Sequence, residues 1–169
     1  MQITSGAVMK IVSFVAASSN SGKTTLIEKI VRILNERGLR VAVAKHASRG
    51  FDLDRPGKDS WRFQEAGAAA VVLVGPERMA VMKRIEREPT PDELVREAGD
   101  CDIIITEGFK RHARNKIEVF RAGVSGDRPL SLNDPTFRAL VSDAPFPVSC
   151  PRFDINDARA VAEYIIAKF

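Results

Sequence analysis

The pattern of apolar and polar positions opens with a strand, a helix and a second strand. Residues 9–16 are a run of β-branched and apolar residues, which is typical of a buried strand. Apolar residues then recur at helical spacing over 24–37, and Gly38 follows where a glycine commonly ends a helix. Residues 40–45 return to a strand pattern. Because parallel strands need a crossover connection, we predict a right-handed β-α-β unit.

The middle of the chain predicts a short helix and a hairpin. Asp59 or Ser60 is placed to cap a helix that ends near Gly67. Two apolar runs, over 70–74 and 79–85, flank a turn that contains glycine and proline. Such a pair of runs favours two antiparallel strands.

The later elements complete an alternating order of strands and helices. Thr90 is placed to cap a helix over 91–98, with Glu93 at the capping-box position. We predict a single three-layer α/β domain over 9–169, with a mostly parallel sheet, helices on both faces, an antiparallel edge hairpin, and residues 1–8 as a loose N-terminal extension. Its remaining elements are strands over 102–106, 117–120 and 138–141, and a last helix from Asn156 or Asp157 to about Lys168.

Composition and charge narrow the function classes only slightly. Apolar residues make up 44% of the 169 residues and charged residues 28%, the balance of an ordinary globular domain. The formal net charge is +4 and the basic residues are spread along the chain, so nucleic acid is not an expected partner. No apolar run approaches the ~20 residues of a membrane-spanning helix, and no signal-peptide pattern stands out. We expect a cytoplasmic protein with no membrane partner, in which Cys101 and Cys150 are free thiols.

The segment between the first strand and its helix carries the candidate chemistry. Residues 17–24 read Ala-Ser-Ser-Asn-Ser-Gly-Lys-Thr and follow the phosphate-loop (P-loop) pattern G-x-x-x-x-G-K-[ST]. Only the first glycine differs, because Ala17 stands there, and alanine is small enough for the turn. The strand before the loop and the helix after it are the context that the motif requires. We therefore predict a P-loop domain that binds a nucleotide with Mg²⁺.

The residue types of this loop suit a bound polyphosphate. Backbone N–H groups at a helix N-terminus point at phosphate oxygens, and Gly22 lets the backbone approach them closely. Lys23 is placed to reach the β- and γ-phosphates, and the Thr24 hydroxyl to bind Mg²⁺. Thr25 is placed at the α-phosphate. The predicted nucleotide-binding residues of the segment are Ser19, Asn20, Ser21, Gly22, Lys23, Thr24 and Thr25.

A carboxylate is expected beside the loop as a further group for the Mg²⁺ ion. Asp102 and Glu107 flank one predicted strand, and five residues of strand span about 16 Å. In a parallel sheet the carboxyl ends of all strands meet at one edge, where ligands bind. Glu107 lies at that edge and Asp102 at the far one. We therefore predict Glu107 as a metal and catalytic residue, directly or through water, and Asp102 as a strand-start residue that faces solvent.

Several segments, in order along the chain, resemble one protein family. The most specific are the D-x-D-x-P-G-K-D-S pattern over 52–60 and the E-G-F-K pattern over 107–110. Together with the P-loop and the shorter segments Lys45-His46, 66–68 and 117–121, they resemble the MobB family of molybdopterin-guanine dinucleotide biosynthesis adaptor proteins. The resemblance implies a GTP-binding protein with weak GTPase activity, usually dimeric, that assists MobA in joining GMP to molybdopterin. GTP and Mg²⁺ are then the expected cofactors, and MobA, molybdopterin and a second copy of the chain the expected partners.

The resemblance adds candidate residues for which structural alternatives stay open. His46 ends the second strand at the ligand edge, where it either faces phosphate and attacking water or bonds the backbone. Asp52 and Asp54 either hold Mg²⁺ and position water or stabilise a turn through their own backbone. Following the resemblance, we predict Asp52 as a metal ligand. We place His46 and Asp54 with Lys23 and Glu107 among the catalytic residues.

For the candidate contacts to the pterin and to the base, structural alternatives also stay open. Lys58 and Asp59 begin a helix, where Lys58 is placed to reach a phosphate of GTP or of molybdopterin and Asp59 is alternatively a cap. Lys110 and Arg111 belong to a basic loop that either binds the pterin phosphate or is a solvated surface. Asp143 either accepts from guanine N1 and N2 or belongs to a turn. No N-K-x-D motif is present, so the expected preference for GTP follows from the resemblance.

Three functions remain compatible with these motifs. The first is a slow Mg²⁺-dependent GTPase, and the second is an adaptor that binds GTP and MobA with little chemistry of its own. The third is a small-molecule kinase or another P-loop ATPase, for which the arginine-rich segment 78–87 would serve as a lid.

Overall fold

The computed structural model describes residues 10–169, so the predicted extension 1–8 lies outside the described residues. The contacts divide the chain into two compact units. Within the described residues, one unit is 10–46 together with Pro89–Phe169, and the other is Ala47–Glu88. Each unit has its own sheet. No helix within residues 10–169 has the length and apolar character needed to cross a membrane.

The first unit is built on a six-stranded sheet in which every neighbouring pair is parallel. The strands lie in the order β2-β5-β1-β6-β7-β8, so the first strand has a later strand on each side. The predicted mostly parallel sheet is confirmed, and β8 is a strand that the sequence pattern did not predict. The bounds are β1 (Lys10–Val15), β2 (Val41–Lys45), β5 (Ile103–Glu107), β6 (Lys116–Phe120), β7 (Phe137–Ser142) and β8 (Arg152–Asp154).

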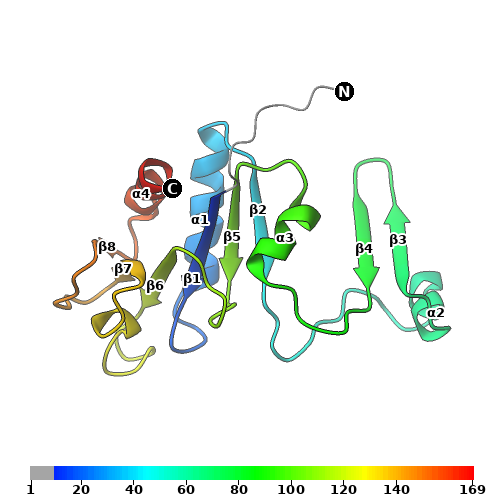
Figure 1. Cartoon of the computed structure of the whole chain (residues 1–169), viewed down its shortest axis with the longest axis horizontal. Helices are drawn as coiled ribbons and strands as arrows, with labels where there is room; N and C mark the ends of the chain where they lie inside the picture. Colours follow the sequence, from blue (N-terminus) through cyan, green and yellow to red (C-terminus); the bar gives the residue numbers. More distant parts are fainter. Residues whose placement is uncertain (1–9) are drawn as a thin grey trace. The chain divides into compact units, whose positions relative to one another are not determined.

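Three helices and a short 3-10 turn complete this unit, and Figure 1 shows α1 and α3 on opposite sides of the sheet. Helix α1 ends as predicted at Gly38, which has φ 79°. The N–H of Gly38 donates to the Asn35 carbonyl and that of Leu39 to the Leu34 carbonyl, the paired bonds of a Schellman motif. The bounds are α1 (Lys23–Glu36), α3 (Pro91–Ala98), η1 (Leu130–Leu132) and α4 (Ala158–Lys168).

The core of this unit lies where α1 and α4 contact each other and the apolar side chains of the central strands. Val12 and Phe14 of β1 face it and are fully buried. Ser13 between them is also buried, and its hydroxyl accepts from Thr106 Oγ1 at 2.8 Å. A strand covered on both sides is apolar with few interruptions, which explains the continuous run in the sequence. Burial of both faces fixes β1 and therefore the loop that follows it.

The second unit contains α2 (Asp59–Glu65) and the strands β3 (Ala70–Val74) and β4 (Met79–Lys83). The predicted antiparallel hairpin is confirmed, and it forms a separate two-stranded sheet instead of extending the larger one. The predicted cap of α2 was wrong: neither Asp59 nor Ser60 is the N-cap, because that position is taken by Lys58. Asp59 is the first residue of the helix, where its carboxylate favours the helix dipole.

Candidate phosphate-binding site

The P-loop follows β1 at the carboxyl edge of the parallel sheet. Phe14 of β1 and Lys45 of β2 both lie opposite Glu107 of β5, which places the ends of three strands at one level. Asp102 lies at the opposite end, as predicted. There its carboxylate accepts from the Arg40 backbone N–H at 2.7 Å and lies 3.6 Å from the Arg40 guanidinium.

The loop between β1 and α1 has the backbone of an anion cradle. Gly22, which directly precedes the helix, has φ 88°, a backbone conformation that residues other than glycine rarely adopt. Asn20 has φ 61°, which asparagine tolerates better than most residues. Ser21 is fully buried, while Ser19, Thr24 and Thr25 are exposed at the rim. The N-terminus of α1 therefore opens onto the loop with no side chain capping it.

Lys23 lies folded over the loop. Its Nζ donates to the Ser18 carbonyl and to Ser21 Oγ, each at 3.1 Å. Burial lowers the pKa of Lys23 from its usual value; Glu107 opposes that shift, while Lys110 and Lys45 add to it. Lys110 also donates to the Ala17 carbonyl at 3.1 Å. The ammonium groups of Lys23, Lys45 and Lys110 therefore lie close to the loop around the Glu107 carboxylate, a balance that favours a polyanion.

Thr24 and Glu107 meet directly at this edge. The Thr24 hydroxyl donates to Glu107 Oε1 at 2.9 Å, and Lys45 Nζ lies 3.5 Å from Glu107 Oε2. The Glu107 side chain is only 12% exposed, and these two contacts hold it in one orientation. The sequence-predicted pair of hydroxyl and carboxylate is thus brought together beside the loop.

We expect the affinity for a nucleoside triphosphate to fall at alkaline pH through Lys23. The free-state pKa of Lys23 is lowered, and bound phosphate raises it again, so affinity is full below the lowered pKa and declines as the pH rises through it. Guanine also loses a proton in this range, so the test is a comparison of Kd against pH for the wild type and Lys23→Arg, whose guanidinium stays charged. The decline is expected to be steeper in the wild type. Identical profiles would contradict this role of Lys23.

His46 packs against the turn that follows Glu107. Its backbone N–H donates to the Glu107 carbonyl at 2.9 Å, and its ring lies 5.3 Å from the ring of Phe109. A Cβ on Gly108 would come within 2.9 Å of the His46 Cβ, and Gly108 has φ 98°. The glycine of the E-G-F-K pattern is therefore required both by its backbone conformation and by the close approach of His46. The predicted catalytic role of His46 stays a prediction.

The other predicted residues divide between the two units. Arg111 is exposed, and Asp143 Oδ1 accepts from the Ala122 backbone N–H at 2.8 Å, which links the end of β7 to the turn after β6. Asp54 accepts from the Arg55 N–H at 2.8 Å and from Gln64 Nε2 at 3.3 Å, which is turn chemistry inside the second unit. Their roles towards a ligand stay predictions, as do those of three further residues of the second unit, which are Asp52, Lys58 and Asp59.

Sequence reasoning assigned no role to one residue at this site. Arg121 directly follows β6, and its Nη2 lies 3.2 Å from the position that a Cβ on Gly22 would occupy. Two signals in the sequence pointed to it: its place after a predicted strand at the ligand edge of a parallel sheet, and its position in the segment 117–121 that resembles the MobB family.

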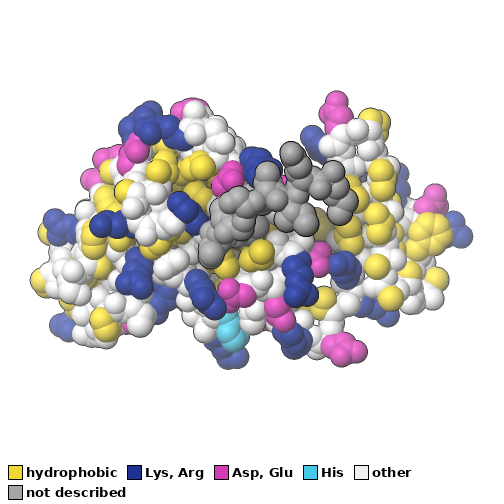
Figure 2. Space-filling model, turned by 45° about the horizontal axis from the view of Figure 1, so that its top comes forward, with side chains coloured by type: hydrophobic (Ala, Val, Ile, Leu, Met, Phe, Trp, Pro, Cys, Tyr) yellow, Lys and Arg dark blue, Asp and Glu magenta, His cyan; other side chains and the backbone are white. Residues whose placement is uncertain are grey.

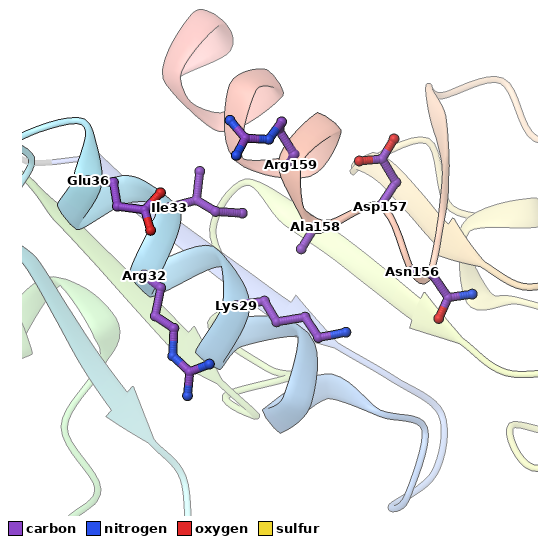
Figure 3. A pocket seen from close by; sticks show the side chains of 8 residues that line it. All are labelled: Lys29, Arg32, Ile33, Glu36, Asn156, Asp157, Ala158 and Arg159. Atoms are coloured by element: carbon purple, nitrogen blue, oxygen red, sulfur yellow. The ribbon is translucent and has the colours of Figure 1, made fainter.

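A separate groove of about 360 Å³ lies between the second half of α1 and the start of α4 (Figure 3). Its charged lining residues include Lys29, Arg32 and Arg159 together with Glu36 and Asp157. Lys29, Arg32 and Glu36 lie on the flank of α1 and Asp157 and Arg159 at the start of α4, whereas the P-loop lies at the N-terminus of α1. The groove and the candidate site are thus different places.

A parallel sheet whose first strand leads through a glycine-lysine-threonine loop into a helix, with a carboxylate at the adjacent strand end, defines a protein of the P-loop class. The family of molybdopterin guanine dinucleotide synthesis protein B, MobB, matches residues 11–143. The chain therefore belongs to the MobB family.

Individual relatives and structures agree with this assignment. The chain is 36% identical over 161 residues to the molybdopterin-guanine dinucleotide biosynthesis adapter protein of Escherichia coli (strain K12), covering 89% of each protein. It is 35% identical over 149 residues to the protein of that name in Haemophilus influenzae, covering 87% of this chain and 83% of the relative. A crystal structure of molybdopterin-guanine biosynthesis protein B superposes with TM-score 0.68 at 28% identity, covering 94% of this chain and 99% of the other. The crystal structure of Bacillus subtilis MobB, at 24% identity, shares the fold with TM-score 0.71, covering 94% of this chain and 97% of the other.

Proposed function

We propose that this protein is a GTP-binding adapter with slow GTPase activity that acts with MobA in molybdopterin guanine dinucleotide biosynthesis. The observation that carries the proposal is the contact of Thr24 with Glu107 beside the Lys23 loop, in a chain whose relatives are named adapter proteins of that pathway. The P-loop geometry supports phosphate binding, and family membership supports the pathway.

The residues beside the loop fit Mg²⁺. This ion takes hard oxygen ligands and keeps several waters, so it is bound through one or two protein oxygens plus substrate phosphates. The Thr24 hydroxyl and the Glu107 carboxylate are such oxygens, 2.9 Å apart. They would hold the ion, directly or through water, and the ion would neutralise charge on the β- and γ-phosphates.

We expect slow turnover because the carboxylate beside Thr24 is already engaged by other groups. Glu107 is engaged by the Thr24 hydroxyl and by the Lys45 ammonium. One contact is made by each carboxylate oxygen, so neither oxygen is free of a protein partner. A carboxylate held in this way serves the ion and is a poor base for water, so hydrolysis depends on positioning and charge stabilisation alone.

Asp143 is our proposed guanine-recognition residue. It follows β7 at the carboxyl edge of the same sheet, and its side chain is exposed. Oδ1 already accepts from the Ala122 N–H at 2.8 Å, which fixes the orientation of the carboxylate. A carboxylate accepting from guanine N1 and N2 discriminates against adenine, which lacks that pair of donors.

The test of the proposed function is GTP turnover by the protein alone, with MobA, and with MobA plus molybdopterin. We expect slow hydrolysis that rises when MobA and molybdopterin are both present, and no such rise with Lys23→Ala. GTP binding without any change in turnover would leave an adapter with little chemistry of its own. Transfer of phosphate to a small metabolite would establish the kinase alternative, although part of its expected lid forms β4 and Arg84 is bonded to the Gln64 carbonyl.

A homodimer is the proposed assembly, and the β3–β4 hairpin supports it. Figure 2 shows hydrophobic side chains gathered over these strands. Val72 lies opposite Val81, and Val74 opposite Met79, so the four share one face, and they are between 41% and 75% exposed. An isolated two-stranded sheet is marginally stable in water, and a second copy placed on this face would cover it.

We expect Val72→Glu to convert the dimer to a monomer, because it places a charge in the middle of that apolar face. Analytical ultracentrifugation gives the oligomeric state. The matched control is Leu73→Glu, on the same strand but the opposite face, which is expected to leave the dimer intact. A dimer that persists in Val72→Glu would exclude this face as the interface.

A further inference from the structure

The turn after β6 is bonded directly to the P-loop. Arg121 begins this turn: its carbonyl accepts from the N–H groups of Val124 and Ser125 at 3.2 and 2.9 Å, and its own N–H donates to Ser125 Oγ at 3.0 Å. Ser18 of the P-loop donates its hydroxyl to the Val124 carbonyl at 3.0 Å. The backbone that carries Arg121 is therefore fixed relative to the loop.

The Arg121 side chain lies against the open side of Gly22. Its Nη2 and Nε are 3.2 and 3.8 Å from the position of a Cβ on that glycine. Glycine is therefore required at position 22 for two reasons: its backbone has a positive φ, and a Cβ would crowd the guanidinium. The guanidinium therefore lies at the backbone that a bound phosphate would approach.

Arg121 lacks a partner for part of its hydrogen-bonding capacity. Its Nε is buried and has no acceptor. Within residues 10–169 no carboxylate forms an ion pair with this guanidinium. A buried donor of a charged group left unsatisfied is costly, and phosphate is the anion that a guanidinium fork binds in bidentate fashion. An anion beside Gly22 would accept from this donor.

The position of Arg121 along the sheet indicates which phosphates it meets. Thr24 and Glu107 mark the metal end of the site on the β5 side of β1, whereas Arg121 comes from β6 on the other side. Its neighbour Ala122 donates its N–H to Asp143, the proposed guanine residue. Arg121 therefore lies between the metal end and the proposed base end of the site.

We infer that Arg121 binds the α- and β-phosphates of the nucleotide, an inference that rests on the proposed function of GTP binding. A contact to these two phosphates is kept after the γ-phosphate leaves. Arg121 is thus a ground-state binding residue for both GTP and GDP and is not a group that acts on hydrolysis alone. Lys23, Thr24 and Glu107, by contrast, lie at the end where the γ-phosphate and the metal ion are expected.

The experiment is equilibrium binding of GTP, GDP and GMP with Mg²⁺ to the wild type, Arg121→Gln and Arg121→Lys. We expect Arg121→Gln to weaken the binding of GTP and of GDP alike by about 10- to 100-fold, because a charged bidentate contact is lost. The binding of GMP is expected to weaken far less. Arg121→Lys keeps the charge without the fork and is expected to fall between. Arg128→Gln, an exposed arginine of the following loop, is the control with unchanged binding.

The Tm of the nucleotide-free variants separates binding from folding. Arg121→Gln removes an unsatisfied buried donor, so its Tm without nucleotide is expected to equal or exceed that of the wild type, while the Tm increase on adding GDP shrinks. A lowered Tm with unchanged affinity, unchanged binding in all variants, or a loss confined to GTP would each overturn the inference. A wild type that binds no nucleotide would overturn the proposed function as well.

Discussion

Replacing Lys23 with alanine is expected to weaken Mg²⁺–GTP binding by at least about 100-fold, because it removes the ammonium that is bonded to both Ser18 and Ser21 within the P-loop. Nζ is held by Ser18 and Ser21 in the position from which it can turn to the β- and γ-phosphates. Isothermal titration calorimetry with a non-hydrolysable GTP analogue gives the ratio of Kd values directly.

The matched control is Lys29→Ala. Lys29 is exposed on the same helix, beyond the P-loop, and its removal lowers the net charge equally. Comparison of the two variants separates a local contact from a general loss of attraction for anions. Equal, small effects of both substitutions would contradict the assignment of Lys23, and circular dichroism of each variant verifies that α1 is intact.

The second large effect is expected at Glu118, through stability and not through binding. This carboxylate is fully buried in β6 and accepts from the backbone N–H groups of Leu130 and Ser131 at 2.8 and 2.7 Å. Glu118→Ala leaves both N–H groups without a partner, and we expect the free energy of unfolding to fall by about 3 kcal/mol.

Urea denaturation measures this loss, and Glu28→Ala on the exposed side of α1 is its control. The control is expected to stay within about 0.5 kcal/mol of the wild type. A Glu118→Ala protein as stable as that control would show that other groups or water replace the lost acceptor. Because η1 connects to the loop before β7, the variant is also expected to show increased hydrogen exchange at residues 130 and 131.

Much of the fold was predictable because its signals are local. The apolar run of β1, the helical spacing of α1 and Gly38 at its end depend on near neighbours in the sequence, and each was confirmed. The capping box was also confirmed, since the Thr90 N–H donates to Glu93 Oε2 at 2.8 Å. The placement of Glu107 beside the loop required one further rule, that parallel strands end at a common edge.

The unpredicted features depend on contacts between distant segments. Strand β8 has only three residues, two of them charged, and becomes a strand by pairing with β7. Glu118 is an acidic residue in a buried strand. The two backbone N–H groups that donate to its carboxylate lie twelve and thirteen residues further along the chain. Arg121 is brought to Gly22 by the pairing of β6 with β1, and no residue spacing encodes that contact.

The predictions for the α2 cap and for Asp54 also depended on which local contacts form. The cap of α2 shifted by one residue, because Lys58 has the extended backbone of an N-cap although its side chain cannot cap. Asp54 has two partners inside its own unit, Arg55 and Gln64, the second of which is on α2. Local turn chemistry therefore accounts for its position, and a role towards a ligand needs its own test.

The most direct test of the central claim is equilibrium binding of GTP and ATP analogues, each with Mg²⁺, to the wild-type protein. Our account predicts saturable binding of one nucleotide per chain, tighter for GTP than for ATP, with an affinity that falls when Mg²⁺ is removed. No binding of either nucleotide, with the protein folded, would contradict the assignment of the Lys23, Thr24 and Glu107 site.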